Sequence, residues 1–211
     1  KTLSLKTDTP LFIILLASFN ILLSKYTSQE DIITGFPVTG RKYEDLAGVI
    51  GLFTTTLPLR NFPSGHKFYR NFLSEVKENF FSARKNQDYP VDSLIEKLNI
   101  QRETERNPLF DVVFSFQNSN VSSFDMNDLK IKLIPGNTGT VKFDFTMGLE
   151  EKDKDINIYM EYRTALFKED TIKRMAGHFI CLLKDVTRNP DCRLKDINIL
   201  TEEELKLFHD F

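Results

Sequence analysis

The chain has 211 residues, a formal net charge of -2 from 28 basic and 30 acidic side chains, and 41% apolar residues. This length suits one large domain or two small ones with a real hydrophobic core. The near-neutral charge gives no long-range attraction toward nucleic acid or an anionic membrane surface, so neither is an expected partner. Nineteen phenylalanines and no tryptophan favour a core packed by aromatic rings.

The cysteines and the apolar segments predict a cytoplasmic protein. Cys181 and Cys192 are too few for a disulfide framework and lack the spacing of metal ligands, so we expect free thiols in a reducing compartment. The first residues do not have the pattern of a signal peptide. The apolar run from Leu11 to Leu23 is short for a membrane span and is typical of a buried helix.

Helical periodicity occurs in several stretches, beginning at Thr9 and Pro10, where the threonine hydroxyl is the expected cap and proline the first helical residue. Thr201 and Glu204 have the spacing of a capping box, which predicts a last helix near the end of the sequence. The expected helices are residues 9–26, 67–88, 91–98 and 172–186, together with a helical turn at 43–47.

Alternating apolar and polar residues predict strands between these helices. Val112, Phe114 and Phe116 share one face of a strand that follows Pro108. Pro58 places the strand 54–60 at a sheet edge or at a bulge. The other expected strands are residues 31–38, 129–133, 141–149, 156–162 and a short extended piece at 194–200, with 121–127 as a loop. Residues 141–162 form the clearest hairpin, and the order of elements predicts an α+β fold with helices packed on one sheet.

The sequence contains no recognisable catalytic constellation. His66, His178 and His209 lack a paired nucleophile, and we expect His178 on the polar side of its helix. There is no phosphate-binding glycine loop, nucleophile elbow or zinc cluster. The acidic residues between 150 and 155 fit a solvated hairpin tip better than a metal site. We therefore expect no metal ion and no catalytic residue in this chain.

Five segments, in order along the chain, carry a resemblance to one family. They are Thr34-Gly-Phe-Pro-Val-Thr-Gly-Arg41, Ile50-Gly-Leu-Phe-Thr-Thr-Thr-Leu-Pro-Leu-Arg60, Asn86-Gln-Asp-Tyr-Pro90, Arg106-Asn-Pro-Leu-Phe-Asp-Val-Val-Phe-Ser-Phe-Gln-Asn118 and Arg174-Met-Ala-Gly-His-Phe179. The second is similar to the pattern I-G-x-F-V-N-T-L-x-L-R, the third to H-Q-D-x-P, and the fourth to R-x-P-L-F-x-V-x-F-x-x-Q-N. Together they resemble the condensation domains of nonribosomal peptide synthetases.

The resemblance implies a fold like chloramphenicol acetyltransferase, in which two αβ lobes form a V and the active-site tunnel lies between them. In this family the catalytic motif H-H-x-x-x-D-G belongs to the N-terminal lobe, and no His-His pair occurs here. Residues 1–200 therefore resemble the C-terminal lobe, a mixed sheet with helices packed on it. Residues 201–211 are similar to the start of a linker toward an adenylation domain.

The family implies an activity that needs both lobes. Intact members form an amide bond between two aminoacyl or peptidyl thioesters, which carrier proteins deliver on phosphopantetheine arms. The implied partners are the N-terminal lobe, the upstream and downstream peptidyl carrier proteins and the adjoining adenylation domain. No cofactor is expected to bind the chain directly, and the lobe alone should be inactive.

Two alternatives stay open because Thr55 replaces the family asparagine and Asn86 replaces the family histidine. The chain could belong to a noncatalytic module that docks carrier domains, or to an epimerisation domain with the same fold. A threonine offers one hydroxyl where an asparagine amide can both donate and accept, so a tunnel hydrogen bond made by that asparagine is in question.

The resemblance also assigns candidate residues. The expected tunnel and inter-lobe residues are Arg41, Gly51, Thr55 and Arg60, within a tunnel floor at 35–56, and a crossing latch is expected at 120–140. Arg41 is expected to pair across the lobes with the aspartate of the catalytic motif, and the alternative is an ordinary turn arginine. The structural motif residues are Asp88, Pro90, Asn107, Pro108 and Asp111. Of these, Asp88 and Asp111 are expected as caps or turn acceptors.

Overall fold

The computed structural model describes residues 1–41, 43–101, 106–118, 123–126, 129–132, 139–152 and 155–209. The helices are α1 (Thr2–Thr7), α2 (Leu11–Thr27), α3 (Tyr69–Lys85), α4 (Val91–Lys97), α5 (Glu169–Arg188) and α6 (Glu202–His209), with 3-10 turns at Glu44–Leu46 and Leu194–Asp196. The strands are β1 (Ile32–Thr39), β2 (Thr54–Asn61), β3 (Val112–Asn118), β4 (Ser123–Met126), β5 (Leu129–Lys132), β6 (Phe145–Lys152) and β7 (Asp155–Tyr162).

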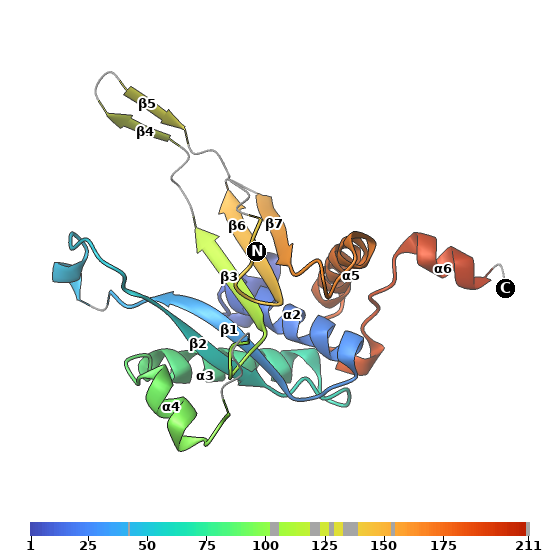
Figure 1. The fold of residues 1–211 in the computed structure, drawn as a ribbon. Coiled ribbons are helices and arrows are strands. Elements are labelled where there is room, and N and C mark those ends of the chain that lie inside the picture. The colour runs from blue at the N-terminus through green and yellow to red at the C-terminus, as the bar shows by residue number, and fades with distance from the viewer. Residues whose placement is uncertain are drawn as a thin grey trace.

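Five strands form a mixed sheet in the order β2-β1-β3-β6-β7 (Figure 1). β3 runs parallel to both β1 and β6, whereas β2 and β7 pair antiparallel with β1 and β6. The predicted α+β fold is confirmed. β2 is an edge strand, one of the two possibilities that Pro58 left open, and β6 and β7 form the predicted hairpin.

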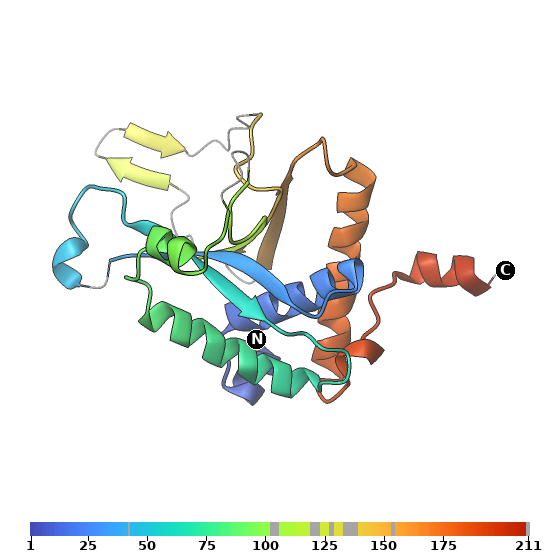
Figure 2. The ribbon, with the colours of Figure 1, turned by 60° about the horizontal axis from the view of Figure 1, so that its bottom comes forward.

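Helix α2 is the centre of the helical layer that covers one face of the sheet (Figures 1 and 2). It is apolar all round, and a helix of that kind must be covered on most sides. The sheet covers one side, through β1 and β3, while α3 and α5 pack beside it. Phe19 of α2 carries this contact, because its ring centroid lies 5.6 Å from that of Phe114 and 6.1 Å from that of Phe145.

The amphipathic helices α3 and α5 bury most of the stripes that their periodicity predicted, although Phe68, the first residue of the stripe predicted for α3, precedes that helix and is 44% exposed. Each helix buries a row of apolar side chains, and both helices pack against α2. The row ends with Phe80 in α3 and with Val186 in α5. None of the helices in the described part of the chain combines the length and the apolar character that crossing a bilayer requires.

The parallel strands bring their carboxyl ends to one edge of the sheet. Because β1, β3 and β6 run in the same direction, the segments that leave them start at this edge. Residues 40–53 form an arm between β1 and β2. The two-stranded hairpin β4–β5 follows β3. Both project from the same side of the body in Figures 1 and 2.

Several local predictions are wrong. The hydroxyl of Thr9 donates to the carbonyl of Thr7 at 3.0 Å and does not cap α2, which starts after Pro10. The sixth strand begins at Phe145 and not at residue 141. Residues 194–200 contain a 3-10 turn in place of a strand, and the expected loop at 121–127 includes β4.

The prediction that His178 lies on the polar side of its helix is also wrong. This side chain was expected to face solvent, yet the residue is buried, with only 6% of its surface exposed. It is on the side of α5 that the segment leading into α6 covers, and a helical pattern alone does not reveal such a cover. Parts of the expected latch at 120–140, namely residues 120–122, 127–128 and 133–138, lie outside the described residues.

Candidate active-site edge

An aromatic hollow of about 410 Å³ opens at the edge where the parallel strands end. Four rings from α2, α3, β1 and β3 line it, and they contact one another with centroid distances of 4.8 Å between Phe12 and Phe80 and 5.0 Å between Phe36 and Phe80. In open sheets that contain parallel strands, ligands commonly bind at the carboxyl ends of the strands. The place and lining of this hollow suit an apolar chain. Its lining residues are Phe12, Phe36, Pro37, Val38, Thr39, Phe80, Arg84 and Phe116.

A second hollow, of about 400 Å³, adjoins the first and is basic. The two share Thr39 and Arg84, and the second adds Arg41, Lys85 and Gln87 from the arm and from the end of α3. Among the described residues, its lining contains three cationic side chains and no carboxylate. Such a lining attracts an anionic group, and arginine is suited to phosphate or carboxylate because of its planar set of donors.

Arg41 is held at the base of the arm. Its guanidinium carbon lies 4.3 Å from the centroid of the Phe53 ring, and one guanidinium nitrogen donates to the carbonyl of Leu46. The backbone N–H of Gly40 donates to the carbonyl of Phe53 at 2.9 Å and closes the base. A guanidinium has five N–H donors, so these contacts leave donors for a further partner. The pairing of Arg41 across the lobes stays a prediction.

The other candidate residues divide between the two ends of the sheet. Thr55 pairs with Val38 at the end where Arg41 lies, and Gly51 belongs to the same arm. Arg60 pairs with Ile33 at the opposite end of β2. The structure therefore brings Arg41, Gly51 and Thr55 to one edge and separates Arg60 from them.

Arg60 has a local partner of its own. Its guanidinium donates to both carboxylate oxygens of Asp31, at 2.9 and 2.7 Å, and these hydrogen bonds lower the pKa of Asp31. Both side chains are about half exposed, and an exposed pair of this kind contributes little to stability. Arg60 and Asp31 therefore form a surface ion pair, and neither residue is among those that line the two hollows.

The remaining motif residues organise turns. Oδ1 of Asn107 accepts from the backbone N–H groups of Leu109 and Phe110, at 3.0 and 3.3 Å, in the manner of an Asx turn. Pro108 lies within this turn. Asp111 accepts the N–H of Asp144 through its backbone carbonyl, at 3.0 Å.

The turn between α3 and α4 carries the other two motif residues. Pro90 occupies the N-cap position of α4, and Asp88 lies exposed in the turn before it. Both positions agree with a structural role. They lie away from the lining of the aromatic hollow.

Sequence reasoning missed the residues that the helices contribute to this edge. Phe12 belongs to an all-apolar helix, where the sequence pattern does not single out one position. Arg84 and Lys85 lie in the last turn of α3, where basic residues are common because they favour the negative end of the helix dipole. Their place beside Arg41 depends on contacts between elements distant in the sequence.

Comparison with known proteins identifies the family. The family model described as "Condensation domain" matches residues 2–208. Gramicidin S synthase 2 of Brevibacillus brevis is 46% identical over 203 residues, which are 95% of this chain and 5% of that protein. Tyrocidine synthase 3 of Brevibacillus parabrevis is 42% identical over 205 residues, 97% of this chain and 3% of that protein. The chain thus spans a small part of these relatives.

Solved structures show the same fold. The chain superposes on a four-domain nonribosomal peptide synthetase bound to AMP and glycine with a TM-score of 0.88 and 18% identity, covering 96% of this chain and 17% of that one. It superposes on the X-domain of teicoplanin biosynthesis, solved in complex with OxyB, with a TM-score of 0.85 and 22% identity, covering 95% and 45%. Together with the sequence matches, these likenesses show that the chain belongs to the condensation-domain family of nonribosomal peptide synthetases.

Proposed function

We propose that this chain is the C-terminal lobe of a condensation domain that forms amide bonds between carrier-bound thioesters. The observation that carries the proposal is the match of nearly the whole chain to that family, with 46% identity over 203 residues to a peptide synthase. The lobe would contribute a wall of the tunnel, and the general base would come from the N-terminal lobe. No such base is found among the described residues of the two hollows.

The two adjoining hollows support a role in guiding a carrier-bound substrate. A phosphopantetheine arm combines a long, largely uncharged chain with a phosphate. Aromatic rings line the first hollow, and Arg41, Arg84 and Lys85 surround the second. This chemistry fits an arm whose phosphate stays near the basic rim, because guanidinium groups bind phosphate through paired hydrogen bonds.

The proposal extends to the neighbours of this lobe. Residues 1–200 would form the lobe, and residues 201–211 would begin the linker to an adenylation domain. The peptidyl carrier proteins on both sides would be the sources of the two thioesters. A cytoplasmic location stays a prediction of the amino-acid sequence.

A second candidate function is docking without catalysis. It is favoured by Thr55 in place of the family asparagine. The X-domain solved in complex with OxyB has the same fold, and at 22% identity this likeness concerns the fold alone. An epimerisation domain, which has the same fold, is the third reading and would convert the stereochemistry of a bound aminoacyl group without forming an amide.

Two arginine variants of the complete protein test the proposal. Arg41→Ala removes a guanidinium at the proposed tunnel edge, and we expect amide formation to fall about tenfold or more, the effect of losing one charge-assisted contact. Arg60→Ala is the matched control, because this arginine lies at the other end of β2, and its rate should stay unchanged. Equal rates for wild type and Arg41→Ala, with both carriers loaded, would contradict the assigned role.

A further inference from the structure

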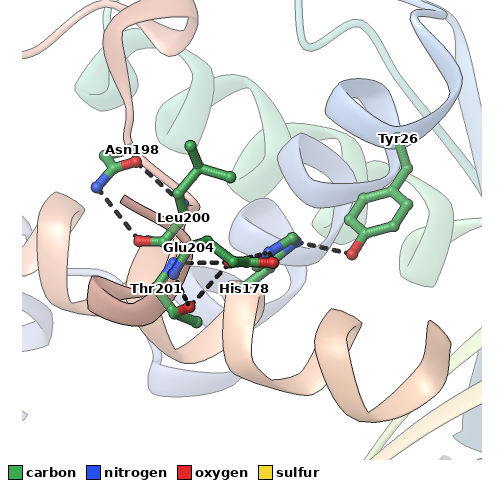
Figure 3. A network of polar contacts seen from close by, with 6 residues as sticks. All are labelled: Tyr26, His178, Asn198, Leu200, Thr201 and Glu204. Atoms are coloured by element: carbon green, nitrogen blue, oxygen red, sulfur yellow. Dashed lines mark hydrogen bonds and ion pairs between the residues drawn. The ribbon is translucent and has the colours of Figure 1, made fainter. Parts of the chain in front are cut away.

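A buried histidine joins three helices at the end of the lobe away from the arm. His178 of α5 has its Nδ1 2.7 Å from the hydroxyl of Tyr26 in α2, and its Nε2 2.8 Å from Oε2 of Glu204 in α6 (Figure 3). The side chain of His178 is only 7% exposed, and that of Glu204 is 24% exposed. The proposed function uses none of these three residues.

The chemistry of the partners fixes the arrangement of the protons. An ionised carboxylate can only accept, so Nε2 of His178 carries a hydrogen and donates it to Glu204. Burial raises the pKa of Tyr26, although the nearby Arg174 guanidinium acts in the opposite direction, so its hydroxyl keeps its proton. The hydroxyl therefore donates to Nδ1, and both ring nitrogens are satisfied while the imidazole is neutral.

Protonation of the ring preserves both contacts. Nδ1–H then donates to the oxygen of Tyr26, and the imidazolium faces the Glu204 carboxylate. The titratable and charged groups that face the ring are Tyr26 from α2, Glu204 from α6 and, next to the tyrosine, Arg174 from α5 itself. The link is thus independent of the charge of the histidine as long as Glu204 is ionised.

Glu204 has a second role, at the start of α6. Its Oε2 accepts from both the backbone N–H and the hydroxyl of Thr201 at 2.9 Å, and the Thr201 hydroxyl accepts from the N–H of Glu204 at 3.3 Å. This is the capping box that the sequence predicted. One carboxylate therefore both starts the helix and attaches it to His178.

The described residues show few polar links between α6 and the body. Figure 2 shows the helix standing away from the helical layer, and a hollow of about 670 Å³ lies between α5 on one side and residues 198–205, which include the start of α6, on the other. Within the described part of the chain, the side-chain hydrogen bonds that join α6 to other elements all run through Glu204. An isolated helix of eight residues is unstable in water, so its order depends on this attachment.

We propose that His178 is a positioning residue that holds the first turn of α6 and thereby sets the direction in which the chain leaves the lobe. The inference is independent of the reaction that the lobe supports. In this proposal, the contact between the His178 imidazole and the Glu204 carboxylate attaches α6 to the lobe. The hydroxyl of Tyr26 orients the imidazole by its hydrogen bond to Nδ1.

Hydrogen exchange in the full-length protein tests this proposal, followed by mass spectrometry on a peptide that covers 202–209. His178→Phe keeps an aromatic ring and removes both hydrogen bonds, and Glu204→Gln weakens the contact from the exposed side. Each should speed exchange of α6 about tenfold, the loss of one hydrogen bond to a charged group, while exchange of α5 stays as in the wild type. His178→Gln, whose amide can donate to Glu204, should restore part of the protection.

Two controls distinguish the effect of the His178–Glu204 contact on exchange from the effect of the helix cap and from the effect of losing a negative charge. Thr201→Ala removes the cap and keeps His178–Glu204, so it should act on the first amides of α6 and leave the later ones less affected. Glu203→Gln makes the same change of charge at an exposed neighbour and should have no effect. If His178→Phe speeds exchange throughout the lobe, the exchange of α6 in Glu204→Gln is the deciding measurement. Unchanged exchange in Glu204→Gln, or an equal effect of Glu203→Gln, would overturn the proposal.

Discussion

The ring of Phe110 lies directly on the Cα of Gly35, so that a Cβ added to this glycine would be only 2.4 Å from Cε2 of the phenylalanine. Gly35 belongs to β1 and pairs with Val113, the residue at which β1 and β3 meet in parallel. Phe110 is 6% exposed and follows the Asn107 turn. Two of the segments that resemble the family are therefore in contact at the centre of the sheet.

The first prediction concerns this contact. In the complete condensation domain, Gly35→Ala should lower the free energy of unfolding by about 1–3 kcal/mol, because the new methyl group overpacks a buried ring. Chemical denaturation measures the change. Gly48→Ala is the control, since nothing lies within 4 Å of the added Cβ there. Equal denaturation midpoints for the two variants would contradict the prediction, because the Phe110 ring would then move aside without loss of unfolding free energy.

The second prediction concerns the aromatic core. Phe114 is fully buried on β3, with the rings of Phe19 and Phe36 at 5.6 and 6.1 Å. Phe114→Ala should cost about 3–5 kcal/mol of unfolding free energy, because it removes apolar contacts and leaves a cavity. Phe62→Ala removes a ring that is 45% exposed and should change stability by less than about 1 kcal/mol. A small loss for Phe114→Ala would mean that the core collapses to fill the space.

The third prediction concerns the pair formed by Arg60 and Asp31. Because both side chains are about half exposed, Arg60→Ala should leave the melting temperature of the complete domain unchanged within error. The two hydrogen bonds from Arg60 should nevertheless affect the pKa of Asp31. Its pKa is lowered in the wild type and should rise in the variant, which carbon-detected NMR measures. An Asp31 pKa that does not respond would contradict the pairing.

The fourth prediction concerns the pH dependence of α6. The N–H of Thr201 is the largest cause that lowers the pKa of Glu204, and the His178 contact acts in the same direction. A carboxyl whose pKa is lowered by folding stabilises the helix fully above its unfolded value, near 4.5, and loses this effect as the pH falls through the lower folded value. NMR shifts of the Thr201 amide should therefore titrate with a midpoint below 4.5. A midpoint at or above that value would contradict the capping geometry.

The elements that could be predicted from the sequence are those that depend on local features of their own segment. The apolar stripe of α3, the alternation across β6 and β7 and the capping box at Thr201 each reflect local periodicity or a short-range hydrogen bond. The edge position of β2 was one of the two possibilities that Pro58 allowed, because this residue lacks an N–H for a second neighbour. In these cases the tertiary structure agrees with the local preference.

The remaining features depend on contacts between distant segments. The parallel neighbours of β3 and the burial of His178 under the segment that leads into α6 have no signal in the local pattern. The same holds for the candidate site: the family motifs pointed to Arg41 and Thr55, whereas Phe12 and Arg84 joined them only through the packing of α2 and α3 on the sheet. Arg60 shares a motif with Thr55, yet strand geometry separates the two.

The most direct test of the proposed function is a condensation assay with the complete domain and two carrier proteins, each loaded with an aminoacyl thioester. The chain described here, run alone beside it, is the matched control. We predict a dipeptide thioester on the acceptor carrier from the complete domain and none from this lobe by itself. If a folded complete domain forms no dipeptide from fully loaded carriers, amide formation is contradicted, and docking or epimerisation becomes the better account.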